Sequence, residues 1–265
     1  MKRTVFLILA LAVLSGARAQ SYSERFQQAL DCNDFKSQRA ILAQWHLSAP
    51  TDVELYIARW NYYVNGYMGE DQSGVFSAHD HAILDSGFAV IDQAIALYPE
   101  RLELRMGKIY FLGQIRLWDD FEKEILRTLD HSEQICHRWT FNGLAGQGAD
   151  LICEGVQDYQ SDMFSTIADR HNLTAPDSAM VGRIRRVAHR TVQLFPSNVP
   201  AMNMLAVSYM LLGENGSAVK HLLRAEAVEP NNPVVLGNLV QAYTSLGQKK
   251  KAQLYQARLK ALPQP

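Results

Sequence analysis

The stretch AVSYMLLGENGSAVKHLLRAEAVEP, residues 206–230, decides the fold of this 265-residue chain. Two segments with helical periodicity flank the pair Leu212 and Gly213, and Pro230 closes the second segment. Apolar residues that recur every three or four positions indicate amphipathic helices. Glycine accepts the left-handed backbone in which many helices end, and proline cannot continue a helix. The stretch therefore predicts a helical hairpin with a tight turn.

The same pattern returns 34 residues later. On this shift Leu205 falls on Leu239, and Tyr209 falls on Tyr243. The other matches pair Leu212 and Gly213 with Leu246 and Gly247, and Ala218 with Ala252. Because a single hairpin cannot bury its own apolar stripe, a repeated hairpin predicts an array of stacked neighbours.

This pattern resembles the tetratricopeptide repeat. When Val199 is counted as position one, the small residue at position eight is Ala206 and the aromatic residue at position eleven is Tyr209. The later positions of the repeat are matched by Ala218, Ala225 and Pro230. The clearest repeats are residues 199–232 and 233–265. The match is incomplete, since position four holds only Met202, Leu259 replaces an alanine, and Pro263 comes one place early.

Weaker copies of the hairpin precede these two repeats. Helical segments end near Pro50, Pro99 and Pro196, and each is followed by another helical pattern. We count about five to six hairpins. The resemblance implies an all-α fold, a right-handed α-α superhelix (a TPR-like solenoid), over residues 20–265. The general order of the sequence is also similar to exported repeat proteins of Bacteroidetes-type bacteria.

The N-terminus has the layout of a secretory signal. Lys2 and Arg3 precede an apolar run, and small residues end at Ala19. This order is typical of a cleaved signal peptide, which we place at residues 1–19. The apolar run is short for a bilayer core of about 30 Å, and no later segment is long and apolar enough to span one. We expect an exported protein of the periplasm or cell envelope that is soluble after cleavage.

Charge and cysteine content narrow the function further. The formal net charge is −1 and no long basic run occurs, which argues against a nucleic-acid partner. Three cysteines are present, Cys32, Cys136 and Cys153, so at least one thiol is unpaired within the chain. Whether Cys136 and Cys153 form a disulfide is left open. Their apolar, helix-like surroundings suit buried thiols better than a catalytic cysteine.

Two sets of residues are candidates for binding a protein or peptide. In tetratricopeptide arrays the first helix of each unit lines a groove, and on this register the resemblance assigns the lining to Asn203, Val207, Met210, Gln241 and Thr244. The cationic set of a chaperone-type carboxylate clamp is absent from these positions. An aromatic patch of Trp60, Tyr62, Tyr63 and Tyr67 is the second candidate. Packing in the core is the alternative interpretation of the patch, and we favour it.

The remaining motifs are weaker indications of a functional site. His79, Asp80 and His81 could bind a transition metal, but a solvated helix start is the simpler interpretation. The arginines of RIRRVAHR, residues 183–190, suit the wet face of a helix better than an anion site. Residues 64–80 and 141–180 break the helical rhythm and are predicted to be insertions or loosened helix ends on the repeat scaffold.

These observations favour a non-catalytic interaction scaffold or adaptor without a metal or cofactor. An enzyme with a site in residues 64–80 or 141–180, or a self-assembling envelope component, is the alternative.

Overall fold

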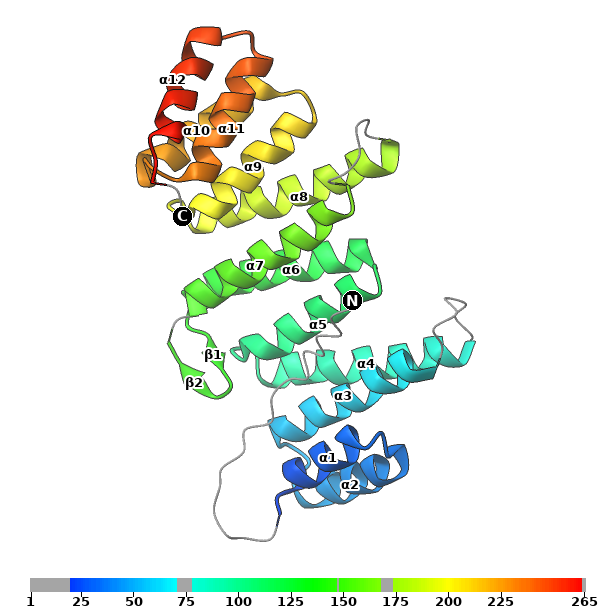
Figure 1. Cartoon of the computed structure of the whole chain (residues 1–265). Helices are drawn as coiled ribbons and strands as arrows, with labels where there is room; N and C mark the ends of the chain where they lie inside the picture. Colours follow the sequence, from blue (N-terminus) through cyan, green and yellow to red (C-terminus); the bar gives the residue numbers. More distant parts are fainter. Residues whose placement is uncertain (1–19, 71–77, 147, 168–173, 264–265) are drawn as a thin grey trace. The chain divides into compact units, whose positions relative to one another are not determined.

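The computed structural model describes residues 20–70, 78–146, 148–167 and 174–263. The chain is built almost wholly of helices, so the predicted all-α fold is confirmed (Figure 1). It divides into two compact units. Unit 1 comprises the described residues up to Arg116 together with Arg138–Gly148, and unit 2 comprises Leu117–His137 and Ala149–Pro265.

Unit 1 begins with two helical hairpins. The first pairs α1 (Tyr22–Asp31) with α2 (Phe35–Ser48), and the second pairs α3 (Val53–Glu70) with α4 (Ala78–Leu97). α5 (Leu102–Gln114) and a two-stranded hairpin of β1 (Thr140–Phe141) and β2 (Leu144–Ala145) complete it. The core of this unit includes Phe26, Trp45, Leu55, Ile91 and Phe111, which come from all five helices.

Unit 2 contains seven helices in the described part of the chain. They are α6 (Trp118–Gln134), α7 (Gly148–Ser165), α8 (Ala175–Leu194), α9 (Val199–Leu211), α10 (Asn215–Val228), α11 (Pro233–Ser245) and α12 (Lys249–Lys260). The hairpins α9–α10 and α11–α12 are the two clearest predicted repeats. Leu205 and Leu239 are both fully buried in the core that these helices share, and so are Ala206 and Ala218. Small residues there let the helices approach closely.

The described parts of the two segments that break the helical rhythm contain more helix than expected. The helix α3 runs on to Glu70 and α4 begins at Ala78, so only residues 71–77 of the predicted irregular segment 64–80 lie outside the described residues. Helix α3 continues past Gly66 because Tyr67 is buried on the face that carries Trp60, and this packing outweighs the low helix propensity of glycine.

The segment 141–180 is also more regular than predicted. It contains the whole of α7 and the start of α8, and residues 168–173 lie outside the described part. The buried face of α7 is made by Ile152, Val156, Tyr159 and Met163. These residues are spaced four, three and four apart, which is the period of a helix. The glycines before them, including Gly143 with φ +77°, turn the short β-hairpin.

The predicted glycine turns are left-handed. Gly213 has φ +77° and Gly247 has φ +70°, and the amide after each glycine donates to a carbonyl five residues back. The equivalent turn after α5 has the same length, three residues between the helices, but there the left-handed residue is Arg116, with φ +59°. A non-glycine residue in this conformation is strained by its Cβ atom.

Because one left-handed position holds glycine and the other holds arginine, we expect substitutions at the two positions to have opposite effects on stability. Gly213→Ala should lower the free energy of unfolding by about 1 kcal/mol, because alanine resists left-handed backbone even though no atom crowds the site. Arg116→Gly should raise it by about 0.5 kcal/mol, because glycine relieves that strain, although its greater freedom in the unfolded chain offsets part of the gain. Urea denaturation followed by circular dichroism measures both. If both variants are less stable than the parent chain, left-handed backbone strain does not determine the effect of substitution at these positions.

Candidate binding surfaces

The first candidate surface lies between α9 and α11 in unit 2. A cavity of about 440 Å³ opens there, and we call it the α9–α11 groove. It is lined by Phe164, Asn203, Met204, Val207, Met210, Leu211, Asn215, Val234, Asn238, Gln241 and Ser245. α9 and α11 are the first helices of their hairpins, so the groove lies on the face that the repeat register assigns to ligand binding.

Four of the five predicted groove residues line this cavity together: Asn203, Val207, Met210 and Gln241. Thr244 does not, and its hydroxyl donates to the carbonyl of Val240 in its own helix, at 2.7 Å. The prediction missed Asn238, whose side-chain amide donates to Oδ1 of Asn203 at 2.7 Å. Its spacing of four from Val234 and three to Gln241 places it on the same helix face and could have revealed it.

The chemistry of the α9–α11 groove is neutral. Amide side chains alternate with methionine and valine, and no charged side chain is among the described residues that line it. Amides can donate to and accept from a peptide backbone, and methionine adapts its shape to different apolar side chains. The groove can therefore hold an uncharged segment of a protein.

The predicted aromatic patch is divided between two environments. Trp60 and Tyr67 are buried, and both rings pack edge-on against Phe111, with centroids 5.3 and 5.9 Å away. Tyr62 and Tyr63 are half-buried and contact each other, with ring centroids 5.5 Å apart. Thus two of the four residues belong to the core of unit 1, and two face a second cavity.

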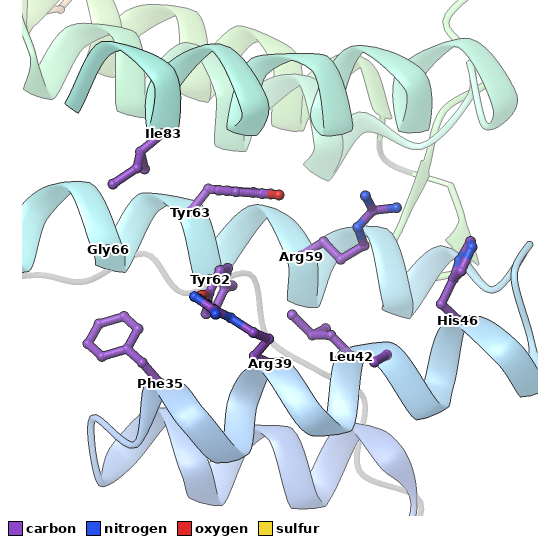
Figure 2. Close-up of a pocket in the computed structure, with 10 residues that line it drawn as sticks. Phe35, Arg39, Leu42, His46, Arg59, Tyr62, Tyr63, Gly66 and Ile83 are labelled. Atoms are coloured by element: carbon purple, nitrogen blue, oxygen red, sulfur yellow. Dashed lines mark hydrogen bonds between the residues drawn. The ribbon is translucent and has the colours of Figure 1, made fainter. Parts of the chain in front are cut away.

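This second cavity, of about 690 Å³, lies between α2, α3 and α4, and we call it the α2–α4 groove (Figure 2). α3 runs between the other two helices. The lining residues are Phe35, Arg39, Leu42, Ala43 and His46 from α2, Arg59, Tyr62, Tyr63 and Gly66 from α3, and Ile83 from α4. α2 and α4 are the second helices of their hairpins, so this groove lies on a face that the repeat register does not assign to ligands.

Two arginines line the α2–α4 groove with no carboxylate of the described residues beside them. The guanidinium of Arg39 donates to the hydroxyl of Tyr62 from Nε at 3.3 Å and from Nη2 at 3.2 Å, which raises the pKa of Arg39. Arg59 is half-buried and forms no hydrogen bond or ion pair with another described residue. No aspartate or glutamate is among the described residues that line the cavity.

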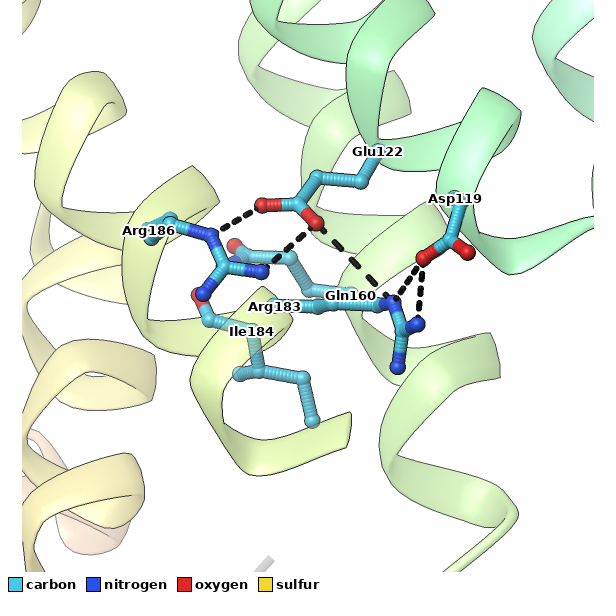
Figure 3. A network of polar contacts seen from close by, with 6 residues as sticks. All are labelled: Asp119, Glu122, Gln160, Arg183, Ile184 and Arg186. Carbon is cyan, nitrogen blue, oxygen red and sulfur yellow. Dashed lines mark hydrogen bonds and ion pairs between the residues drawn. The ribbon is translucent and has the colours of Figure 1, made fainter. Parts of the chain in front are cut away.

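The arginines of α8 are in the opposite situation. Glu122 of α6 accepts from Arg186, with Nη2 and Oε2 2.8 Å apart, and Asp119 accepts from Arg183 (Figure 3). Arg190 pairs with Asp130 and Glu133, and Arg185 pairs with Glu214. The hydrogen bond from Arg183 lowers the pKa of Asp119. These arginines join α8 to its neighbours, so the predicted wet face is in fact an ion-paired helix contact.

A buried amide adds a third helix to this contact. Nε2 of Gln160 on α7 donates to the backbone carbonyl of Ile184 on α8, at 3.1 Å (Figure 3). Because Gln160 is almost completely buried, this bond satisfies a side-chain nitrogen that water cannot reach. The network therefore stabilises unit 2 and leaves little free positive charge on α8.

The cysteines do not form a catalytic arrangement. All three are free thiols, and Cys32 and Cys136 are exposed, so the expectation that they are buried is wrong for these two. Both lie just beyond the last turn of a helix, where side chains leave the packed face. Cys153 is half-buried, and burial raises its pKa to about 11, which keeps it a protonated thiol at neutral pH.

The other sequence candidates add no further site. The side chains of His79, Asp80 and His81 lie outside the described residues, although α4 does begin at Ala78, as the helix-start interpretation predicts. Among the described residues no group of three or more His, Cys, Asp or Glu side chains could hold a metal ion. No described helix is both long and apolar enough to cross a membrane.

Comparison with known proteins gives matches only among solved structures. No protein-family profile matches the chain, and no curated protein does. The structure of PilW, a type IV pilus biogenesis factor, is similar with a TM-score of 0.40 and 17% identity, over 91% of each chain. TTC0263, a tetratricopeptide protein of Thermus thermophilus, gives 0.38 and 16%, over 68% of this chain and 84% of that one. MamA of AMB-1 gives 0.35 and 12%, over 91% and 89%. At these scores, function has to be inferred from the grooves themselves.

Proposed function

We propose that this protein is a non-catalytic interaction scaffold that holds an uncharged segment of a partner protein in the α9–α11 groove. The observation that carries the proposal is the convergence of Asn203, Val207, Met210 and Gln241 on one cavity. These side chains come from two successive repeats, so the groove is built by the stacking of hairpins and not by a single loop. An array of this kind offers a preformed surface along which a segment can lie.

The location that we propose is the periplasm or the cell envelope. The basis for this is the order of basic, apolar and small residues in residues 1–19, which lie outside the described part of the chain. Removal of this segment would leave a mature protein that begins at Gln20. The scaffold would then meet its partner after export.

One experiment tests both the proposed scaffold function and the proposed export. The tagged protein is recovered from its native cells, its intact mass is measured, and the proteins that copurify are identified. We expect a mass that corresponds to a chain beginning at Gln20 and a reproducible partner. Met210→Glu should reduce recovery of this partner by about tenfold or more, because a carboxylate placed in the half-buried groove must lose its hydration when the segment binds.

Leu223→Glu is the matched control. Leu223 is partly exposed on α10 and does not line the groove, so the same charge there should leave the partner bound. Equal recovery with Met210→Glu, or the absence of any reproducible partner, would contradict the proposed scaffold function. A mass that includes residues 1–19 would contradict the proposed export but would leave the proposed scaffold function untouched.

A further inference from the structure

The α2–α4 groove has an apolar end and a cationic end. Phe35, Gly66 and Ile83 lie at one end, and Arg59 and His46 lie toward the other (Figure 2). Arg39 and Tyr62 lie between them and are joined by hydrogen bonds. A ligand that fills this groove must therefore present an apolar group and an anionic group at some distance from each other.

Gly66 keeps the apolar end open. A Cβ atom built on Gly66 would be 4.0 Å from the ring of Phe35, which is ordinary contact distance, so a larger side chain at this position would project into the groove. Phe35 is also unusually exposed for a phenylalanine, at 36%. Water therefore contacts an aromatic ring here that a ligand's apolar side chain could cover.

No carboxylate of the described residues lies at the cationic end. Among the described residues, Arg59 has no carboxylate partner, and Arg39 donates to the neutral hydroxyl of Tyr62. The α8 arginines, in contrast, are paired with aspartate and glutamate. A guanidinium that is half-buried beside aromatic rings gains most from an anion that brings its own charge, because the surroundings are partly desolvated.

The length of the groove favours a segment of chain. Its lining on α2 extends from Phe35 to His46, which is about 16 Å at 1.5 Å per helical residue. From Gly66 to Arg59 along α3 is about 10 Å by the same rise. A peptide in the extended polyproline II conformation advances about 3.1 Å per residue with three residues per turn, so two of its side chains three positions apart lie on the same side, about 9 Å from each other, and match that spacing.

We propose that the α2–α4 groove binds a short extended segment of a partner protein that carries a large apolar side chain and, about three residues away, an aspartate or glutamate. The apolar side chain covers Phe35 near Gly66, and the carboxylate accepts hydrogen bonds from Arg59. This second binding surface is separate from the α9–α11 groove in residues and in charge. Either surface can therefore fail in an experiment without the other.

A panel of fluorescein-labelled, amidated peptides tests the proposal by fluorescence polarisation with the full chain. Each peptide carries one phenylalanine or leucine and one glutamate, separated by two to five residues in a Gly-Ser background. Each has a twin with glutamine for glutamate and a twin with serine for the apolar residue. We expect the peptides with a separation near three to bind and both twins to bind about tenfold more weakly or less. Added salt should weaken the binding.

Variants of the chain locate the site. Arg59→Gln should weaken the best peptide about tenfold or more, and Gly66→Leu should abolish its binding by filling the apolar end. Arg127→Gln is the matched control, because it removes the same charge from an exposed position on α6, where 59% of the side chain is accessible. Circular dichroism checks that each variant is folded. If Gly66→Leu is not folded, the comparison of Arg59→Gln with Arg127→Gln decides.

Three outcomes would overturn the proposal. The first is that no peptide in the panel binds at millimolar concentration. The second is that the glutamine twins bind the parent chain as well as the glutamate peptides do, or that the Arg59→Gln variant binds the glutamate peptides as well as the parent chain does. The third is that decanoate, a small amphipathic acid, binds in an Arg59-dependent manner while the peptides do not, which would assign the groove to a free carboxylic acid.

Discussion

Replacement of Trp139 by alanine should lower the free energy of unfolding of unit 1 by about 3–5 kcal/mol. Trp139 is 1% exposed, although it belongs to a segment outside the repeats, Arg138–Gly148. The guanidinium of Arg105 lies 5.8 Å from the centre of its ring. Truncation therefore leaves a large cavity and removes a cation–π contact in a desolvated position.

The effect should extend to the β-hairpin. The amide of Thr140 donates to the carbonyl of Glu100 at 2.9 Å, so the hairpin is attached to the chain before α5 next to Trp139. Without the indole ring, the segment keeps the hydrogen bonds from the amide and the hydroxyl of Thr140 to this carbonyl but loses its largest buried side chain. We expect the hairpin amides of the variant to exchange with deuterium faster than those of the parent chain.

Tryptophan fluorescence in urea gives a suitable measurement. The chain has four tryptophans, and in the variant Trp45 and Trp60 still report on unit 1, while Trp118 reports on unit 2. Leu144→Ala is the control, since Leu144 lies in the same hairpin but is 75% exposed, and it should change stability by no more than about 0.5 kcal/mol. Equal effects of the two substitutions would show that Trp139 does not anchor the segment.

The fold could be predicted wherever the periodicity of apolar residues was followed. The turn and helix boundaries around Gly213 and Gly247 agree with the register of the repeat. Helix α7 was missed because the glycines before it suggested a long irregular segment. The stripe from Ile152 to Met163 had the helical period all along, so periodicity was the better guide than composition.

The candidate binding surfaces could be predicted only in part. The register of the repeat placed Asn203, Val207 and Met210 on one helix face, and this requires only local geometry. The α2–α4 groove requires the placement of three helices, because Arg39 and Arg59 are 20 residues apart in the sequence. Whether an arginine lacks a carboxylate partner is a property of the tertiary structure. For this reason the sequence did not distinguish Arg59 from the paired Arg186.

Leu205→Ala and Leu239→Ala should have different effects although the two leucines occupy equivalent positions in successive repeats. Both are fully buried, and a buried leucine replaced by alanine typically costs about 2–5 kcal/mol. Leu205 lies on α9, which packs against α8, α10 and α11. Its replacement should lower the free energy of unfolding of unit 2 by this full amount.

Leu239 lies on α11, in the last hairpin that the structure describes. In an array whose repeats contact only their neighbours, a terminal hairpin can unfold while the rest stays folded. The loss of stability caused by Leu239→Ala should therefore appear first as faster hydrogen exchange that is confined to α11 and α12. Leu239→Ala should lower the urea midpoint of α8–α10 only to the extent that these helices lose their contacts with α11.

Hydrogen exchange with peptide resolution separates these two cases, with urea denaturation of the same samples as the second measurement. Leu205→Ala should speed exchange across α8 to α12, because the interior hairpin supports both sides. If Leu239→Ala instead shifts the midpoint as much as Leu205→Ala and speeds exchange uniformly, unit 2 unfolds as one cooperative body. The neighbour-by-neighbour energetics of a repeat array would then not apply to it, and the α9–α11 groove could not open by fraying of its last hairpin.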